Sequence, residues 1–509
     1  ACLASYTARA TACLRSSTKL RKQRSTTHAR GHLSDAFHRP RLLLRHDTTY
    51  VRPSSSSRIM AIDATWYPSR CNAIAPSRRR RSMHVHVRGI HTSSFASFYH
   101  VGTSRVHVVR VGTRADRSRS CAMGPSPSPF GRTTTWWELA CVQQQPGLRM
   151  GAVARMFRIH KRIGTCFVSQ ELQAKYETAR SERQDVVCIT NRVSGQQCWY
   201  NGNRKNKPQT FRNQNQSSCD PTQGGGIGKC DFCEWDKYTA VDPFGRIENP
   251  HAVTASNLFK FNPYHGLVLF KHHEPLQFDY QQMEGMLDAA WEWLNKAHAH
   301  GQRQWREQMY PLIIWNCLPR SGASQYHGHA QTLLSPVPFP EQERLLADIS
   351  RYRDTHGGRD YLSDLLDAHA EAGLARCLQE KGESGICYAS LTPLKDKEIV
   401  VQGNDLESQA FRRMLYVCLR ALIDCMGVET FNLVIQNISF EEQAPLANRL
   451  PVMARMVSRG SMQSKASDFG ALEVFAGASL AKTDPYAVIQ GVDRMAEKTP
   501  WTLSILEPT

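Results

Sequence analysis

Two histidines and a glutamine alternate with small residues in the segment SGASQYHGHAQ, residues 321–331. Successive side chains of a β-strand point to opposite faces, so His327, His329 and Gln331 are expected along one face. Gly328 and Ala330 then take the other face, where they leave room for something packed closely behind. Because a polar row is costly to bury unless each member has a partner, the spacing predicts a ligand over this row.

A second group with chemical potential is the cysteine pair Cys230 and Cys233 in the segment GKCDFCEW. A CxxC pair supplies two of the four ligands of a tetrahedral zinc site, and the alternative is a pair of reduced thiols that opens a loop. The chain has 16 cysteines at irregular spacings, unlike a secreted disulfide framework. Reduced thiols are therefore expected.

The elements that must position these residues occur in a repeated order. Residues 265–270 and 311–315 predict strands on either side of a helix over 279–297, and the strand of the histidine row follows. Asp279 is a candidate N-cap for that helix, with Gln282 three residues on.

The second copy of this order has strands at 397–401, 431–437 and 451–457, and a helix over 406–426 that stops at Gly427. It lacks the His-x-His-x-Gln row, so one half is expected to carry the chemistry and the other to complete the scaffold or pocket. Residues 340–383 predict a polar helical connector between the copies.

The first 150 residues have a different composition from the rest. They hold 25 of the 64 Lys and Arg residues but five of the 45 acids, which gives a net charge of +20 there and −1 in the remainder. They are rich in Arg and Ser and show no sustained apolar periodicity, so we expect a disordered basic arm. A transit peptide, a disordered tail and an extension that the native protein lacks all fit this composition.

The charge balance gives no reason to expect a nucleic-acid partner, because the folded part is close to neutral. No apolar run approaches the roughly 18 residues that span a bilayer, so no membrane partner is expected. We expect location in a plastid or mitochondrion if the arm is a transit peptide and in the cytoplasm otherwise.

The segment NCLPRSGASQYHGHAQ resembles the active-site segment of the histidine-triad superfamily, in its branch of nucleotidyltransferases and phosphorylases. Asn316 precedes His327 by 11 residues, as in galactose-1-phosphate uridylyltransferases. The turn before the histidines is similar to that of diadenosine tetraphosphate phosphorylases (ATP adenylyltransferases). That similarity rests on Ser321, Gly322, Ser324, Gln325, His327, His329 and Gln331.

This resemblance implies an α+β fold of two histidine-triad-like halves, each an antiparallel sheet with helices, of which only the first is catalytic. We expect the first half over 155–338, the connector over 339–385 and the degenerate second half over 386–509. A homodimer is compatible with this organisation.

The resemblance also implies that His329 is the nucleophile. A neutral imidazole attacks phosphorus well and leaves well, so a nucleoside monophosphate can pass between two phosphate acceptors through a covalent histidine intermediate. A backbone carbonyl is expected to accept from the other ring nitrogen and so set the tautomer. The alternative is that both histidines of the row are ordinary residues with satisfied partners.

The remaining polar residues of the motif are expected to contact phosphate. The amide of Gln331 can donate to a non-bridging oxygen, and Asn316, Ser324 and the neighbouring backbone amides can stabilise developing charge. Gly322 lets the backbone approach closely. Ser321 and Gln325 are expected to contact substrate as well.

By the same resemblance, Cys230, Cys233, His273 (or His272) and His327 are expected to hold a structural zinc, and no organic cofactor is expected. Asn257 and Phe259, in the segment ASNLFKFNPYHGLVLF, are candidates for the nucleoside pocket. Three further candidates for an outer phosphate or sugar phosphate are Arg455, Arg459 and Lys465.

Three functions remain open at this point. The first is a nucleotidyltransferase that makes or consumes a nucleotide sugar, which the zinc set favours. The second is a dinucleotide polyphosphate or nucleotide-sugar phosphorylase that uses the same histidine, which the Ser-Gly-Ala-Ser-Gln turn favours. The third, a non-enzymatic nucleotide-binding protein, is disfavoured by the intact His329.

Overall fold

The computed structural model describes residues 134–143, 151–175, 183–206, 220, 230–304, 306, 308–440, 450–464 and 466–509. All of them fall in the second of the chain's two compact units, residues 96–509. Most of the predicted basic arm and the candidate Lys465 lie outside the described residues. No helix of the described part is long and apolar enough to cross a membrane.

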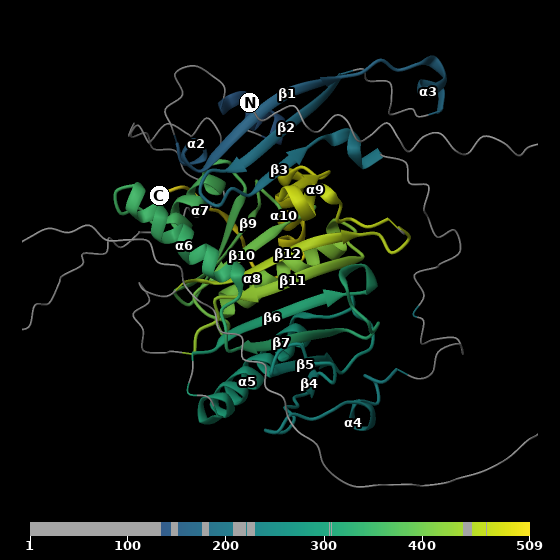
Figure 1. The fold of residues 1–509 in the computed structure, drawn as a ribbon, viewed down its shortest axis with the longest axis vertical. Helices are drawn as coiled ribbons and strands as arrows, with labels where there is room; N and C mark the ends of the chain where they lie inside the picture. The colour runs from purple at the N-terminus through teal and green to yellow at the C-terminus, as the bar shows by residue number, and fades with distance from the viewer. Residues whose placement is uncertain are drawn as a thin grey trace, which may run out of the picture. The chain divides into compact units, whose positions relative to one another are not determined.

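A wholly antiparallel sheet of ten strands carries the predicted row. Its order is β14-β8-β9-β10-β12-β11-β6-β7-β5-β4, and Figure 1 shows the strands from β9 to β4 following one another in this order. The strands are β4 (Ala252–Ser256), β5 (Tyr264–Phe270), β6 (Tyr310–Cys317), β7 (His329–Ser335), β8 (Ala375–Glu380), β9 (Glu383–Ala389), β10 (Ile399–Gly403), β11 (Thr430–Gln436), β12 (Val452–Gly460) and β14 (Ser504–Ile505).

A smaller sheet has the order β1-β2-β3-β13. It consists of β1 (Phe157–Thr165), β2 (Arg183–Asn191), β3 (Gln197–Tyr200) and β13 (Ala478–Ala481), the last parallel to β3. This sheet was not predicted, and neither was the pairing of β3 with β13, a four-residue strand far away in the chain.

The described helices include two long ones that follow the first strand of each repeated set. These are α5 (Tyr280–Gln304) and α8 (Gln409–Arg420), the latter continued by a π-helical turn over Ala421–Cys425. The others are α1 (Trp136–Gln143), α2 (Ala152–Met156), α3 (Gln170–Lys175), α4 (Trp235–Tyr238), α6 (Pro340–Thr355), α7 (Tyr361–Glu371), α9 (Ala471–Ala476) and α10 (Pro485–Ala496), with 3₁₀ turns at Gly202–Asn206 and Pro319–Ser321.

The predicted order strand, helix, strand, strand is present twice, as β5-α5-β6-β7 and β10-α8-β11-β12. The predicted cap of α5 is confirmed, because Gln282 N donates to Asp279 Oδ1 at 2.8 Å and Asp279 N to Gln282 Oε1 at 2.9 Å. The second helix begins later than expected, after the N-cap Ser408, and its π-helical turn ends before Gly427 at φ 62°. The predicted fold class, α+β with antiparallel strands, is confirmed.

The large sheet has two different faces. Alternate residues of β6 are buried, and Ile313, Trp315 and Cys317 belong to the main core together with buried residues of α5 and α8. Asn316, between two of them, belongs to the opposite face. Gln331 pairs across the strands with Ile314 and lies on that opposite face too. One face of the sheet therefore packs against the helices α5 and α8, and the other carries the candidate site residues.

Two predicted boundaries differ from the structure. The basic arm does not extend to residue 150, because α1 packs into the main core through Leu139 and Ala140, which are fully buried. Trp136 stacks on Tyr200 at 6.0 Å. The connector predicted over 339–385 is helical in α6 and α7, but it ends in β8 and the first residues of β9. The first difference concerns a short helix whose partners lie elsewhere in the chain, and the second a local hairpin of β8 and β9.

Candidate active site and metal cluster

The turn that leads into the histidine row has an unusual backbone. Leu318 has φ 69° and Gly322 has φ 98°, and only glycine adopts the second value at no steric cost. Ser321 Oγ donates to Leu318 O at 2.7 Å, and Ser321 N donates to the same oxygen at 3.0 Å. Ser321 is thus committed to holding the turn, whereas Ser324 is exposed beyond it. A positive φ in leucine is costly and is maintained by such contacts.

His329 is the first residue of β7 and is buried, with 6% of its surface exposed. Its Nδ1 lies 2.8 Å from the carbonyl oxygen of His327, which can only accept, so Nδ1 carries the hydrogen. Its Nε2 makes no hydrogen bond to any residue that the structure describes. Burial lowers the pKa of His329. The hydrogen bond to His327 O raises this pKa, but by less than burial lowers it. The ring is therefore a neutral imidazole with a free Nε2 lone pair, as the sequence led us to expect.

Gly328 and Ala330 take the opposite face, as predicted. A Cβ at Gly328 would meet a ring carbon of Phe270 at 2.8 Å, and Ala330 is fully buried. Phe270 N donates to Gly328 O at 3.0 Å. The strand itself begins at His329, so His327 lies just before it. The ring of His327 belongs to the cysteine and histidine cluster described below.

Gln331 lies beside a buried histidine that sequence reasoning missed. Its Oε1 is 2.8 Å from His265 Nε2, and Asn257 Nδ2 is 2.9 Å from the same nitrogen. A nitrogen cannot donate to one group and accept from the other at once, so the His265 tautomer decides which amide it bonds. Burial lowers the pKa of His265, which keeps it neutral. Asn257 and Gln331 are thus brought together, whereas Phe259 is 84% exposed.

Asn316 lies on the face of the sheet that carries His329. The ladder of β6 and β7 pairs Ile314 with Gln331, and Asn316 and His329 follow two residues beyond this pair on their strands, so both project from the same face. Asn316 Oδ1 accepts from Asn432 Nδ2 at 2.6 Å. Asn316 and the candidate nucleophile thus belong to the same face of two neighbouring strands.

Four predicted ligands come together beside this row. Cys230, Cys233, His273 and His327 place their candidate ligand atoms within 4.8 Å of one another. Cys233 Sγ is 3.2 Å from His273 Nδ1, and Cys230 Sγ is 3.5 Å from His327 Nδ1. Bonds of about 2.3 Å to sulfur and about 2.0 Å to nitrogen at tetrahedral angles would separate S and N by about 3.5 Å. The cluster can therefore hold a metal ion.

Both imidazole rings of this metal cluster are oriented by a hydrogen bond at Nε2, the ring nitrogen that does not face the thiols. His327 Nε2 donates to Phe270 O at 2.7 Å, and His273 Nε2 lies 2.6 Å from the carboxylate of Asp220. Each Nδ1 is left to face the thiols, an arrangement typical of metal-ligating histidines. Burial lowers the pKa of His327 to about 4, so its ring is neutral. The alternative ligand His272 packs against Phe270 instead, at 4.8 Å between ring centroids.

The metal cluster and the nucleophile candidate share one side chain. Phe232, between the two cysteines, packs edge-on against His329 at 5.2 Å and against His327 at 6.0 Å. Burial, then the neighbouring Cys230, raises the pKa of Cys233 to about 11, so without a cation the Cys233 thiol stays protonated. A bound metal would deprotonate the thiols and hold the loop that carries Phe232.

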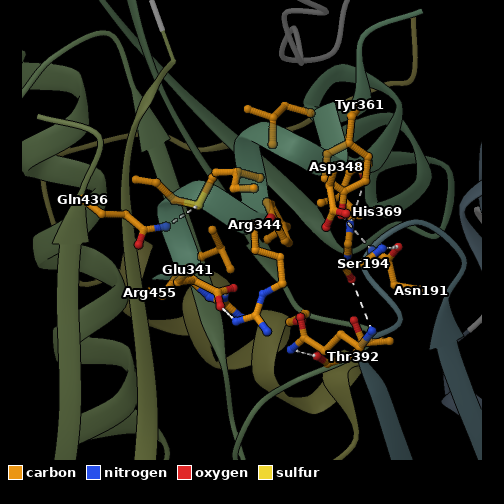
Figure 2. A pocket seen from close by; sticks show the side chains of 18 residues that line it. Asn191, Ser194, Glu341, Arg344, Asp348, Tyr361, His369, Thr392, Gln436 and Arg455 are labelled. Atoms are coloured by element: carbon orange, nitrogen blue, oxygen red, sulfur yellow. Dashed lines mark hydrogen bonds and ion pairs between the residues drawn. The ribbon is translucent and has the colours of Figure 1, made fainter. Parts of the chain in front are cut away.

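The other two described cationic candidates lie in the second set of strands. Arg459, near the end of β12, donates to Asn432 Oδ1 and pairs with Asp468. Arg455 lines a cavity of about 80 Å³ between α6, α7 and β9–β12 (Figure 2). It pairs there with the buried Glu398 at 2.7 Å. Arg455 is thus part of a satisfied ion pair, apart from the histidine row.

Three residues of the site were missed by sequence reasoning although a signal existed. Phe232 lies inside the CxxC pair, His265 opens a predicted strand, and Asn432 interrupts the apolar strand 431–437. Each is a polar or aromatic residue next to a recognised element. Asp220 had no such signal, because its neighbours in the sequence form no pattern.

No protein-family model matches the chain, and no curated protein matches its sequence. Solved structures do match. An ADP-glucose phosphorylase from Arabidopsis thaliana with bound ADP-glucose is 16% identical, with a TM-score of 0.43, over 59% of this chain and 95% of that chain. A uridylyltransferase is 13% identical, with a TM-score of 0.41, over 61% and 98%.

A yeast Ap4A phosphorylase in complex with AMP is 14% identical, with a TM-score of 0.26, over 62% of this chain and 84% of that chain. The solved structures that this chain resembles thus include uridylyltransferases and phosphorylases.

Proposed function

We propose that the chain is a nucleotidyltransferase that acts through a covalent histidine–nucleoside monophosphate intermediate on His329. One observation carries the proposal: His329 is buried and neutral, its Nδ1–H is bonded to His327 O, and its Nε2 makes no bond to a described residue, on the sheet face that also carries Gln331 and Asn316. Most buried polar groups in a core are hydrogen-bonded. A nucleophile needs this lone pair and this fixed tautomer.

The transfer has two displacements. The Nε2 lone pair of His329 attacks the α-phosphorus, an N–P bond forms, and the bond from phosphorus to the leaving phosphate oxygen breaks with its electron pair. A phosphate oxygen of the acceptor then attacks the same phosphorus and the N–P bond breaks. The ring keeps its Nδ1 hydrogen throughout, and His327 O stabilises the positive charge that the ring carries in the intermediate.

The polar neighbours of His329 hold the phosphates in this proposal. Asn316 and Gln331 donate their amide hydrogens to non-bridging oxygens, and Ser324 with the amides after Gly322 binds the adjacent phosphate. Asn257 and the exposed ring of Phe259 lie at the nucleoside end, where Phe259 offers a stacking surface for a base.

We propose the histidine-triad-like organisation in two halves for the same reasons. The first half, built on β5-α5-β6-β7, carries His329. In the second, β12 presents Met453 and Arg455 on the face that corresponds to the row. Methionine has no nitrogen nucleophile, and Arg455 is a cation paired with Glu398, so neither offers a free nitrogen lone pair. The second half is the scaffold that flanks the site.

The metal that fits the cluster is zinc, because two thiolates and two imidazoles form a common tetrahedral donor set for it. We assign it a structural role: it would hold the segment 230–238 against the row.

The donor substrate is a nucleotide sugar or a dinucleotide polyphosphate. The assembled metal cluster favours a reaction like that of galactose-1-phosphate uridylyltransferase, in which the monophosphate passes between sugar phosphates. The turn Ser-Gly-Ala-Ser-Gln favours the second candidate, a phosphorylase that transfers to inorganic phosphate or ADP. The free Nε2 of His329 argues against a protein that only binds nucleotides.

A substrate panel tests this assignment. The purified chain is incubated with UDP-, GDP- or ADP-sugars or with diadenosine tetraphosphate, each with hexose-1-phosphate or with inorganic phosphate, and products are separated by ion-exchange chromatography. We expect one donor to be consumed and its nucleoside monophosphate to appear on the acceptor. If every donor is left intact with both acceptors, the proposed reaction is wrong.

A further inference from the structure

Asn316, Asn432 and His329 form one row across three neighbouring strands. Asn432 on β11 is paired directly with Asn316 on β6, and such residues project from the same face of a sheet with their side chains in contact. Asn316 and His329 lie two residues beyond the Ile314–Gln331 pair on β6 and β7, so they project from that face too. Asn432 belongs to the second set of strands, so the row joins the two sets at the site.

The hydrogen-bond partners determine how the Asn432 amide is oriented. Nitrogen and oxygen of an amide are ordinarily assigned from their partners, and arginine can only donate. Because Arg459 Nη1 donates to Asn432 Oδ1, the other end of that amide must be the NH₂ group. Its two hydrogens go to Asn316 Oδ1 at 2.6 Å and to Ser321 O at 2.8 Å.

The same logic extends to Asn316. Its Oδ1 is occupied by the donor from Asn432, so its own NH₂ group points away from Asn432. In the proposed reaction an amide oxygen at that position would repel a phosphate oxygen, whereas the NH₂ group attracts it. The orientation of the Asn316 amide therefore decides whether this residue attracts or repels the phosphate.

Arg459 is itself held in place. Its Nε donates to Asp468 Oδ2 at 2.7 Å and its Nη2 to Asp468 Oδ1 at 2.9 Å, a two-point contact. Lys395 Nζ donates to the backbone oxygen of Asp468. Burial alone would raise the pKa of Asp468, but the bonds and charges of Arg459 and Lys395 outweigh it and lower that pKa. Asp468 is thus ionised at neutral pH and anchors the guanidinium.

We propose that Asn432, fixed by Arg459 and Asp468, is a positioning residue that turns the Asn316 NH₂ group toward the phosphate and holds the turn at Ser321. This inference rests on the proposed function, in which Asn316 contacts the transferred phosphate. Asn432 touches no substrate and acts through Asn316.

The test uses Asn432→Asp in the full chain. The introduced carboxylate keeps an oxygen toward Arg459, but it has no hydrogen for Asn316 Oδ1, so the Asn316 amide turns its NH₂ group toward that carboxylate. We expect the single-turnover rate of His329 nucleotidylation to fall about 10²-fold, as on loss of one preorganised donor, with a much smaller change in KM. Asn295→Asp, an exposed site on α5, introduces the same charge and should keep the wild-type rate.

A double-mutant cycle separates positioning from a general structural role. In an Asn316→Ala background there is no Asn316 amide to orient, so Asn432→Asp should cause a much smaller loss of rate than in the wild-type background. The loss that remains comes from the hydrogen bond to Ser321 O, which the aspartate cannot make. Arg459→Lys, which keeps one donor for Asn432 Oδ1, should retain more activity than Arg459→Met. Independent, multiplying losses from the Asn316 and Asn432 substitutions would overturn the inference.

A second measurement needs no substrate and so decides the matter even if the proposed function fails. Urea unfolding is compared for Asn316→Ala, Asn432→Ala and the double variant. Because the two side chains share a hydrogen bond, the shift of the midpoint in the double variant should be smaller than the sum of the single shifts. Additive shifts would contradict the inferred coupling between Asn432 and Asn316. If the variants show this coupling but the wild-type chain is not nucleotidylated, the proposed reaction is contradicted. The inferred hydrogen bond between Asn432 and Asn316 is then still supported.

Discussion

Gly328 offers the sharpest test of how packing behind the histidine row sets the site. In Gly328→Ala the added Cβ would lie 2.8 Å from Phe270 Cδ2 and 3.1 Å from the backbone Cα of Pro275. Gly328 does not have a positive φ, so alanine meets no backbone strain there and the effect of packing is isolated.

The neighbours of Gly328 cannot yield cheaply. The Phe270 ring is fully buried and packs against Phe278 at 5.9 Å and Trp315 at 5.3 Å. Ordinary carbon contacts lie at about 3.5–4.0 Å, so the strand must move by roughly 1 Å. Overpacking of this kind costs roughly 1–3 kcal/mol of the free energy of unfolding. A displacement of about 1 Å at a reacting group costs about 10²-fold in rate.

We therefore expect Gly328→Ala to lower the thermal midpoint by roughly 2–6 °C and the rate of nucleotide transfer by about 10²-fold. Calorimetry and a single-turnover assay measure the two effects. The control is Gly164→Ala on β1, where the new Cβ would have its nearest neighbour at 3.8 Å and should change neither. A Gly328→Ala protein with wild-type midpoint and rate would refute the claim that close packing positions His329.

Three further predictions follow from other parts of the chain. Cys230→Ser should lower both the bound zinc, expected at about one per chain by elemental analysis, and the thermal midpoint; a metal-free native protein of unchanged stability would disprove the site. A chain starting at Thr134 should melt as the full chain does, whereas one starting at Val153 should melt lower because it lacks α1; equal midpoints would show that α1 is dispensable. Burial lowers the pKa of His369 to about 4, so the unfolded chain takes up a proton between pH 6.5 and 4 that the folded chain refuses, and stability falls as pH falls through that window. His369→Gln should remove about 3 kcal/mol of this fall in urea titrations, and an unchanged pH dependence would contradict it.

The histidine row shows what a sequence can predict about a site. Spacing alone placed His329 and Gln331 on one face and Gly328 on the other, because strand periodicity is local. The CxxC pair and the two later histidines were joined into one metal cluster through a resemblance, and the structure brings these four together. Features that depend on residues close together in the sequence, such as the strand alternation and the CxxC pair, could therefore be predicted.

Contacts between distant segments could not be predicted in this way. Asn432 reads as one polar residue in an apolar strand, and its role depends on β11 lying next to β6, more than a hundred residues away in the chain. α1 was assigned to the basic arm because its eight residues are too few to give a clear helical pattern, and a helix of this length depends on tertiary packing for its stability. The commitment of Ser321 to the turn depends on the backbone of Leu318, which no pattern in the sequence reveals.

The central claim is that His329 carries the nucleotide. The most direct measurement incubates the chain with the donor that the panel identifies, labelled at the α-phosphorus, and then denatures it. A histidine phosphoramidate is labile to acid and stable to base. We expect wild-type chain to retain such label and His329→Gly to retain none while it still binds the donor through Asn316 and Ser324. Equal label on His329→Gly, or no label on a wild-type chain that turns the donor over, would contradict the claim.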